Sequence, residues 1–477
     1  MKKLVHILIA ILLVAVSCED EKYATSSDVK LEFSATAVRF DTIFPEIGAG
    51  TQHIKVYNRY DQSLLVSSIR LASGEASPFH LNINGMSSDE MQDMVIPPRD
   101  SIYIFIEVSE DVNNTNQSFF LRDSIEFITN NNSQDVDLMA WSQEVNIVKN
   151  DIVKSETWTN DKPYLVSRPV KVAKNAVLTI SAGTKIYFHH GTRLLVAGKI
   201  IAKGSCDQPI VFQTDRMEPL FQNLPDLWNG IVLAPGSYDN VLDFVEVRNA
   251  HIGLQVGSIE EKGFATAVIG NSRFISNFYA GIFSVKSKLQ VYNTLIADYH
   301  RYGAALLLGG EYDFYHTTIA NYDLDPVKLR LTPSLLLSNY LIVNKDDKEP
   351  ETLTGDLKKA YFSNVIIAGD APSGNEVGME QNSEANFNFL FDHCLLQMCD
   401  TFNVSNPNHY KHILKGVNPR FADPFRMRFE LDSISPARDA GLRDIGDLYP
   451  YDLAKQNRIS DLAPDLGAYE RIDKPKK

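Results

Sequence analysis

The sequence predicts an all-β protein in which a small β-sandwich is followed by a solenoid of stacked β-strand coils. Residues 29–148 contain strands in which apolar and polar residues alternate, and residues 150–471 contain shorter strands bounded by Gly, Pro or Asn. Alternation with period two places one face of a strand in a core and the other in water. An apolar motif also recurs in the second region about every 22–25 residues, and such a repeat is the signature of a solenoid.

The first residues predict export from the cytoplasm. Lys2 and Lys3 precede an apolar run over residues 4–16, which is too short to span a bilayer and is typical of a signal peptide. Residues 14–18 (VAVSC) resemble the lipobox of bacterial lipoproteins, although Ala15 stands where that family usually has Leu. The resemblance implies a signal peptide over residues 1–17 and lipidation of Cys18. The alternative is a plain secretory signal that leaves a free cysteine.

Residues 18–28 are mostly polar and form a predicted tether. Its acidic residues Glu19, Asp20 and Glu21 resemble the surface-export signal of some Gram-negative lipoproteins. This implies an outer-membrane lipoprotein of the cell envelope, exposed at the cell surface rather than facing the periplasm. An ordinary solvated tether is the alternative. No other segment approaches the ~20 apolar residues of a transmembrane helix.

Composition and charge agree with an exported globular body. Hydrophobic residues make up 44% of the 477 residues, which is enough for more than one core. The net charge of −14 argues against nucleic acid as a partner. Besides Cys18 there are three cysteines, Cys206, Cys394 and Cys399, so disulfides do not build the fold.

The strands of residues 29–148 predict a β-sandwich. Residues 51–58, 100–108 and 124–129 alternate with period two and are separated by turn-forming residues such as Asn84-Gly85 and Pro97-Pro98. Residues 96–108 (IPPRDSIYIFIEV) resemble the immunoglobulin-like modules of the MSP/ASH kind. Those modules mostly act as spacers and protein-binding units, and the resemblance implies that role here.

The strands of residues 150–471 suit coils better than a sandwich, because each is short. Residues 194–204 (LLVAGKIIAKG), 209–212 (PIVF) and 228–233 (WNGIVL) closely resemble the N-terminal coils of right-handed parallel β-helix proteins of the pectate-lyase-like superfold. The resemblance implies a right-handed parallel β-helix over this region. It covers about 320 residues and indicates the fold rather than an activity.

An internal repeat supports the coils. Its members share a polar residue followed by an apolar ending, and they are 271–274 (NSRF), 293–296 (NTLI), 316–319 (HTTI), 339–342 (NYLI), 364–367 (NVII) and 393–396 (HCLL). We expect the apolar endings to stack inside the coils and the Asn side chains to form ladders at the bends. Gly253, Gly281 and Gly303 follow strands at similar offsets, so we expect turns with positive φ at these glycines.

The C-terminal residues strengthen the resemblance. Residues 418–424 (NPRFADP), 435–441 (SPARDAG) and 464–470 (PDLGAYE) resemble closing motifs of secreted bacterial β-helix proteins. We expect them to cap the final coils, because an open end exposes unpaired strand edges. The family's usual Gly between Asp452 and Arg458 is missing, and Lys455 stands near its position.

The catalytic residue sets of β-helix enzymes are not evident. The paired carboxylates Asp346 and Asp347 lie in a charged stretch that reads as a solvated loop. A lyase would need carboxylates that bind Ca²⁺ and an Arg or Lys base. The candidates for such a binding site are Asp243, Glu246, Arg248 and Arg273. Strict alternation places Asp243 on the opposite face from Glu246 and Arg248, and an outward charged face with pairing between coils is the alternative.

Other residues give weaker signals. His189-His190 could supply a base or ligand, although an exposed histidine beside a packed one explains the pair. His393 beside Cys394 is better explained by a buried coil position than by a metal site. The aromatic residues could stack on sugars or fill the core, and those considered are Phe278, Tyr279, Tyr299 and Tyr302.

The sequence therefore favours a lipid-anchored cell-envelope protein that presents a β-helix surface for binding a glycan or a protein, without catalysis. Its expected partners are the membrane, through the lipid, and a polysaccharide or an envelope protein. No cofactor or metal is expected. The alternatives are a polysaccharide lyase or glycoside hydrolase, for which Ca²⁺ is a possible cofactor, and an adhesive protein that binds another envelope protein.

Overall fold

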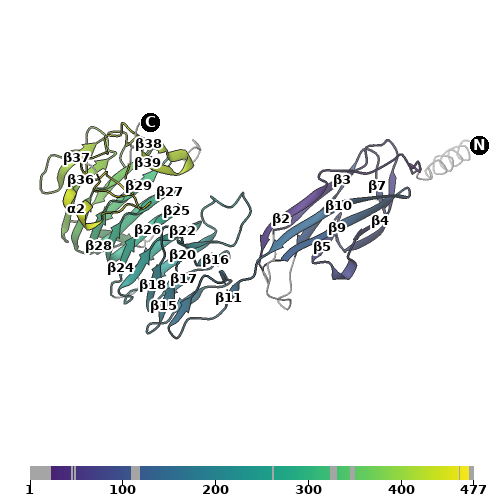
Figure 1. Ribbon diagram of the computed structural model, residues 1–477, viewed down its shortest axis with the longest axis horizontal. Helices are drawn as coiled ribbons and strands as arrows, with labels where there is room; N and C mark the ends of the chain where they lie inside the picture. The colour runs from purple at the N-terminus through teal and green to yellow at the C-terminus, as the bar shows by residue number, and fades with distance from the viewer. Residues whose placement is uncertain are drawn as a thin grey trace, which may run out of the picture. The chain divides into compact units, whose positions relative to one another are not determined.

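A computed structural model describes residues 23–44, 47, 50–108, 119–259, 263–322, 330–343, 350–460 and 462–471. The chain forms two compact units, residues 1–144 and 145–477. In the described residues one α-helix, α2 (Arg443–Leu448), and two 3-10 turns accompany the strands, so the predicted all-β class is confirmed (Figure 1). Residues 1–22, with the predicted signal peptide and Cys18, lie outside the described residues, and no described helix has the length and hydropathy to cross a membrane.

The first unit is a β-sandwich of two five-stranded sheets. One sheet has the order β1 (Glu32–Phe33), β3 (Gln52–Tyr57), β8 (Ser101–Val108), β5 (Phe79–Ile83) and β6 (Met86–Ser87). The other has the order β2 (Ala37–Ile43), β10 (Asn132–Ser142), β9 (Phe119–Thr129), β4 (Leu64–Leu71) and β7 (Glu90–Ile96). The strands are antiparallel except for the parallel pair β2–β10. In β8 the side chains of Ile102, Ile104 and Ile106 are buried in the core while Tyr103 and Phe105 are exposed, which confirms the predicted alternation.

The second unit is a parallel β-helix whose strands form three stacked columns. Column one contains β12 (Glu156–Trp158), β15 (Val177–Ile180), β18 (Lys199–Lys203), β21 (Asn240–Asp243), β24 (Thr266–Gly270), β26 (Ala280–Tyr292), β28 (Tyr302–Tyr315), β33 (Leu357–Ser363) and β36 (Phe387–Leu396).

Column two contains β11 (Asn146–Val148), β13 (Tyr164–Val166), β16 (Lys185–Phe188), β19 (Ile210–Thr214), β22 (Val245–Arg248), β25 (Arg273–Asn277), β27 (Leu295–Tyr299), β29 (Thr318–Asn321), β34 (Ile366–Gly369), the end of β36 and β37 (Tyr410–Lys415). Column three contains β14 (Val170–Val172), β17 (Leu194–Val196), β20 (Trp228–Leu233), β23 (Ala250–Val256), the first halves of β26 and β28, β30 (Leu335–Ser338) and β35 (Val377–Glu380).

The interior of the coils is filled by aliphatic and aromatic side chains that stack in register. Phe274 pairs with Ile296, Ile296 with Ile319, and Ile319 with Ile367. All four side chains are fully buried. The apolar endings of the repeat therefore stack as predicted. β11 belongs to the parallel sheet although it lies within residues 29–148, because it pairs with β13.

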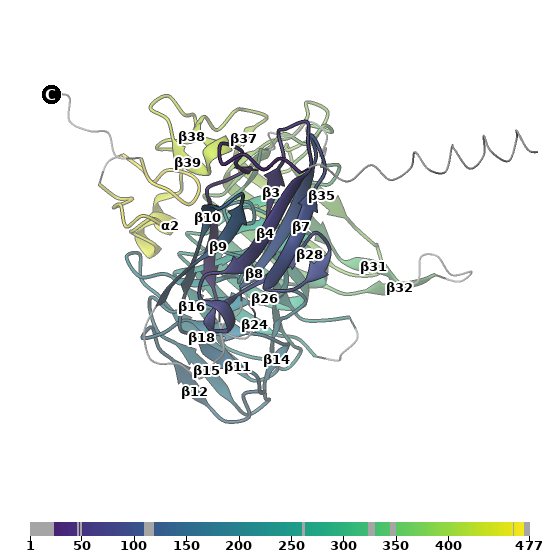
Figure 2. The same cartoon turned by 90° about the vertical axis from the view of Figure 1, so that its right-hand side faces the viewer.

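One member of the repeat is an exception, and the prediction for it was wrong. Residues 339–342 do not enter the stack, because β31 (Tyr340–Val343) pairs antiparallel with β32 (Glu351–Thr354). The resulting hairpin projects from the coils (Figure 2). Ile319 therefore pairs directly with Ile367 on the next coil. The hairpin contains about as many residues as one coil. Its motif therefore keeps the spacing of the repeat, although the hairpin is not a coil.

The predicted turns at Gly253, Gly281 and Gly303 were also wrong. None of the three has positive φ, and each lies where the backbone is tightly packed. A Cβ at Gly303 would lie 2.3 Å from Ile319 Cγ2, and one at Gly281 would lie 2.5 Å from Ile296 Cγ2. A series of left-handed residues lies instead at the bend between columns one and two, with φ between 44° and 58°: Phe244, Asn271, Asn293, His316, Asn364, His393 and His412. Asn and His are enriched in this conformation among residues other than Gly.

The C-terminal segment, which we expected to cap the final coils, covers the side of the coils. It contains β38 (Phe421–Asp423), β39 (Arg428–Leu431) and α2, and it packs along the outer side of column two (Figure 1). Its apolar residues cover Ile275, Leu295, Ala320 and Ile366, which point outward from that column. The segment reaches back to the early coils, where Lys455 Nζ lies 3.7 Å from Asp207 Oδ2. The segment thereby removes the outward apolar residues of column two from water.

A buried ion pair links two parts of this segment, and its arginine also donates a hydrogen bond to Asn293 on the coils. Arg458 and Glu470 are 0% and 1% exposed, and Nη1 of Arg458 lies 3.4 Å from Oε2 of Glu470. Asp452 accepts hydrogen bonds from the backbone N–H groups of Ala454, Gln456 and Glu470. Lys455 has a φ of 62°, so it adopts the left-handed conformation where the resembling family has Gly.

Candidate functional site

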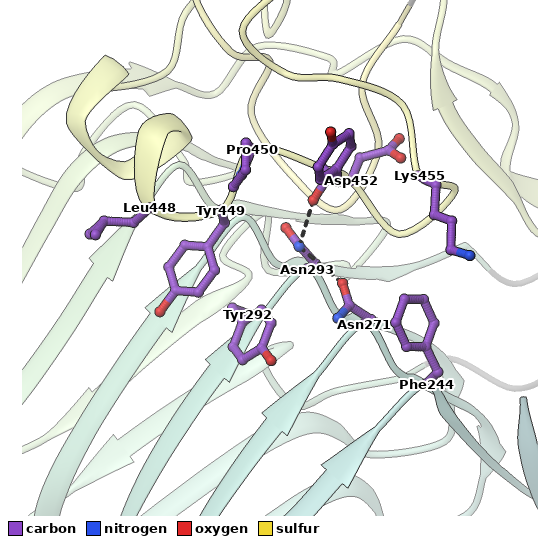
Figure 3. A pocket seen from close by; sticks show the side chains of 10 residues that line it. Phe244, Asn271, Tyr292, Asn293, Leu448, Tyr449, Pro450, Asp452 and Lys455 are labelled. Atoms are coloured by element: carbon purple, nitrogen blue, oxygen red, sulfur yellow. Dashed lines mark hydrogen bonds between the residues drawn. The ribbon is translucent and has the colours of Figure 1, made fainter. Parts of the chain in front are cut away.

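The C-terminal segment forms a groove where it crosses the bend between columns one and two. The groove has a volume of about 510 Å³. On the side of the coils it is lined by Phe244, Asn271, Tyr292 and Asn293. The opposite side is formed by the last residue of α2 and the residues that follow it, namely Leu448, Tyr449, Pro450, Tyr451, Asp452 and Lys455 (Figure 3).

Tyr292 and Tyr449, which line the groove, stack together with Tyr315 beside it. Tyr292 and Tyr315 occupy the same register position on consecutive coils. The ring of Tyr449 lies against both, with centroid distances of 4.6 Å to Tyr292 and 5.5 Å to Tyr315 and interplanar angles of 20° and 28°. Gln290 Nε2 donates a hydrogen bond to the Tyr449 hydroxyl at 2.8 Å, so Tyr449 is held by both stacking and a polar contact.

Gly270 explains how Tyr292 is positioned. Gly270 and Tyr292 are partners in register on consecutive coils. A Cβ at Gly270 would lie 2.2 Å from Tyr292 Cζ and 2.3 Å from its hydroxyl oxygen. The phenol ring of Tyr292 therefore lies directly over the bare backbone of the preceding coil. Any larger residue at position 270 would lift this ring.

The bend residues form a hydrogen-bonded floor. Asn293 Nδ2 donates to Asn271 Oδ1 at 3.0 Å and to the backbone carbonyl of Tyr451 at 2.7 Å. Asn271 Nδ2 donates in turn to Asp243 Oδ1 at 2.8 Å. This confirms the predicted ladder of Asn side chains at the bends for Asn271 and Asn293. Figure 3 shows Tyr292 and Phe244 on opposite sides of Asn271. The groove thus combines aromatic walls with an amide floor.

Burial controls the charge of the groove. Burial, with a contribution from Asp243, raises the pKa of Tyr292 to about 12, so its hydroxyl stays protonated at neutral pH. Burial also raises the pKa of Asp243, while the Asn271 hydrogen bond and Lys203 act in the opposite direction. The groove therefore offers the protonated Tyr292 hydroxyl and amide groups, and its lining also contains Asp452 and Lys455.

The structure brings together three of the four candidate binding residues. Glu246 and Arg273 are partners in register on β22 and β25, and Glu246 Oε1 lies 3.1 Å from Arg248 Nε. Glu246 Oε2 lies 3.9 Å from Arg273 Nη1. Asp243 is separated from them by the bend at Phe244, lies in column one and bonds to Asn271 beside the groove. The three therefore form an outward charged cluster with pairing between coils.

The histidines and aromatic residues considered from the sequence lie outside this charged cluster. His189 Nδ1 lies 2.7 Å from the buried Asp215 carboxylate, and His190 is exposed. Tyr299 is buried and donates a hydrogen bond to Ser334, so it is a core residue. Phe278, Tyr279 and Tyr302 are half-buried at the surface. Asp346 and Asp347 lie outside the described residues.

Tyr292, Tyr315 and Tyr449 were not among the sequence-based candidates. Each is one of 20 tyrosines, and no local motif distinguishes it. The signal that could have identified Tyr292 and Tyr315 is their equal position relative to Asn293 and His316 of the repeat, because each immediately precedes the bend residue. Nothing in the sequence indicates that Tyr449 lies against them.

No family model matches the chain, and no curated protein matches it. Solved structures show limited likeness. The complex of XylC with xylose is 10% identical with a TM-score of 0.30, covering 92% of this chain and 88% of that one. The Agl-KA catalytic domain is 11% identical with a TM-score of 0.31, covering 78% and 79%. The E. coli chaperone DraB is 14% identical with a TM-score of 0.17, and the match covers 24% of this chain and 56% of DraB. The fold assignment rests on the strand pairing described above.

Proposed function

We propose that the protein is a cell-envelope lipoprotein that binds a glycan in the groove between the coils and the C-terminal segment, without cleaving it. The observation that carries the proposal is the stack of Tyr292, Tyr449 and Tyr315 beside the amide floor of a cavity of about 510 Å³. Ligand sites are concave and combine apolar walls with a few placed polar groups.

The chemistry of the groove suits a sugar. A pyranose ring has an apolar C–H face, which packs on an aromatic surface, and a rim of hydroxyls, which need donors and acceptors. Phe244 and Tyr292 supply the aromatic surfaces, and Asn271 supplies an amide. A flat aromatic ring with a polar end loses little conformational entropy when it binds a ligand. We infer that neutral or weakly charged sugars fit best, because the Tyr292 hydroxyl is protonated.

The described carboxylates near the groove support binding rather than hydrolysis. Glycoside hydrolysis uses two carboxyl groups roughly 5–10 Å apart, one of which gives or takes a proton. The carboxylate of Asp452 is engaged by three backbone N–H groups, and that of Glu246 lies against two guanidinium groups. Asp313 Oδ1 accepts a hydrogen bond from the Tyr315 hydroxyl and lies 2.6 Å from Lys359 Nζ. Asp243 remains, with one oxygen bonded to Asn271. A single such carboxylate does not make a catalytic pair.

The proposal includes the anchor and the exposure of the protein. Lipid on Cys18 would hold the chain in the outer membrane, and two or three acyl chains give stable anchoring. The sandwich would act as a spacer between the membrane and the β-helix at the cell surface. The lipid motif of residues 14–18 and the independent core of the sandwich support this arrangement.

The test is a glycan array combined with a polysaccharide-digestion screen, using the chain from Lys22 onward, with and without Ca²⁺. Binding without release of shorter or unsaturated oligosaccharides is the expected result. Release of such products would overturn the non-catalytic proposal and direct attention to Asp243, Glu246, Arg248 and Arg273. Absence of both binding and release would reject the glycan and favour an envelope protein as partner.

A further inference from the structure

Two histidines occupy equivalent bends on the last two coils. Asp392 on β36 pairs with Lys411 on β37, and Cys394 pairs with Ile413, so His393 and His412 lie directly next to each other. Both have the left-handed conformation, with φ of 51° and 50°. Their rings stack with centroids 4.1 Å apart and an interplanar angle of 30°.

Both imidazoles present Nδ1 to the same carboxylate. Asp392 Oδ1 lies 2.8 Å from His393 Nδ1 and 3.4 Å from His412 Nδ1. The three potential ligand atoms lie within 4.8 Å of one another, and no other group of three His, Cys, Asp or Glu residues in the described part of the chain is as close. The side chains of Asp392 and His393 are 13% and 19% exposed, whereas His412 is 68% exposed.

The other bends show that this arrangement is not needed for the fold. Asn271, Asn293 and Asn364 adopt the same backbone conformation with an amide side chain in place of the imidazole. His316 is the third histidine in this position, but it is fully buried and accepts a hydrogen bond from Asn364 Nδ2 at Nε2. The last two coils are therefore distinct in combining two accessible imidazoles with a carboxylate.

We propose that Asp392, His393 and His412 bind a divalent transition-metal ion of the Zn²⁺ class. Two imidazole nitrogens and one carboxylate oxygen form a known type of zinc ligand set, with bonds of about 2.0–2.2 Å. The exposure of His412 leaves a coordination position open to solvent or to a ligand. Imidazole ligands favour Zn²⁺, Ni²⁺ and Cu²⁺ over Mg²⁺ and Ca²⁺.

The neighbouring groups are compatible with this site. Cys394 is not a ligand, because it is buried and its thiol lies 3.4 Å from the backbone carbonyl of Phe362. Lys411 is exposed next to Asp392, so its ammonium group is free to extend into solvent. Asp392 also lies at the same register position as Tyr315 and Ser363, so the site shares a sheet edge with the tyrosines of the groove.

The test is titration of the chelator-treated full-length protein in detergent with Zn²⁺, and separately with Mg²⁺, by calorimetry. We expect one Zn²⁺ per chain and no Mg²⁺ binding. His412→Asn and His393→Asn preserve the bend, because Asn occupies it elsewhere, and each should weaken Zn²⁺ binding at least tenfold. His251→Asn is the control, since it removes a histidine whose Nδ1 lies 2.8 Å from Asp226 but which has no second imidazole partner of this kind.

Equal Zn²⁺ affinity of the wild-type protein and both bend variants would overturn the proposal, as would the absence of stoichiometric binding. Circular dichroism spectra of the variants serve as the control that they are folded. The result is independent of the groove, because none of these substitutions touches a residue that lines it.

Discussion

The ring of Tyr449 stacks on the ring of Tyr292 at a centroid distance of 4.6 Å, although Tyr292 ends strand β26 and Tyr449 follows the α-helix α2. This contact exists because the C-terminal segment runs back along column two and crosses its edge. The groove therefore forms only where the C-terminal segment lies against the coils. Its walls are contributed by parts of the chain that are far apart in sequence.

Substitution Tyr449→Ala should weaken glycan binding about tenfold, which corresponds to ~1.4 kcal/mol. The reason is the loss of the ring that spans Tyr292 and Tyr315 and of its hydrogen bond with Gln290. Calorimetry with a glycan from the array measures the change. Tyr238→Ala is the matched control, because Tyr238 is 44% exposed and does not line the groove. Equal losses in the two variants would argue against the groove as the binding site.

Substitution Gly270→Ala should also reduce glycan affinity while leaving the fold intact. The new Cβ would overlap the far end of the Tyr292 side chain, which can move by changing its rotamer. We therefore expect a displaced ring, a loss of several-fold in affinity and a decrease in unfolding free energy of about 1–3 kcal/mol. Binding and urea unfolding measured on one sample check both parts. Unchanged affinity would show that Tyr292 does not contact the glycan.

Substitution Arg458→Met should destabilise the second unit by about 3–5 kcal/mol, because it leaves the Glu470 carboxylate buried without its cation. Arg426→Met is the control. Arg426 is 84% exposed and lies 3.8 Å from Asp423, so its removal should cost less than about 1 kcal/mol. Thermal unfolding of both variants distinguishes them. Similar melting temperatures would mean that the C-terminal segment is not held by this pair.

Much of the fold was predictable because it depends on local pattern. Alternation in β8 and the apolar endings at Phe274, Ile296, Ile319 and Ile367 specify which side chains face a core, and the structure places them there. The hairpin formed by β31 and β32 was not predictable in this way, because its length and composition imitate a coil.

The candidate site was less predictable, for a physical reason. Strand alternation describes one coil at a time, whereas the groove depends on where the C-terminal segment lies against column two. Residues 418–424 and 464–470 indicated a C-terminal module, but they did not indicate where it packs on the coils. The glycines illustrate the same limit, since Gly281 and Gly303 are required by contacts with the next coil rather than by a turn in their own.

Substitution Cys18→Ser should abolish lipid attachment. A serine has no thiol to carry diacylglycerol, so the protein should no longer incorporate labelled palmitate and should move from the membrane fraction to the soluble fraction. Metabolic labelling and cell fractionation measure this directly. Palmitate in the serine variant would place the lipid elsewhere, and a wild-type protein without label would indicate a plain secretory signal. Protease accessibility on intact cells then tests surface exposure.

The stability of the second unit should depend on pH through Asp465. Burial raises the pKa of Asp465 to about 6, although it accepts hydrogen bonds from the backbone N–H groups of Asp439 and Arg471. Between pH 4 and 6 the folded chain keeps this proton while the unfolded chain has lost it. The stabilising contribution is thus complete below about pH 4 and is lost as pH rises through 6, with an upper limit of roughly 3 kcal/mol for a shift of about two units.

Urea unfolding of wild type and Asp465→Asn at pH 4, 5, 6 and 7 tests this. The wild type should lose stability relative to the variant over that range, whereas a constant difference would mean that Asp465 titrates normally.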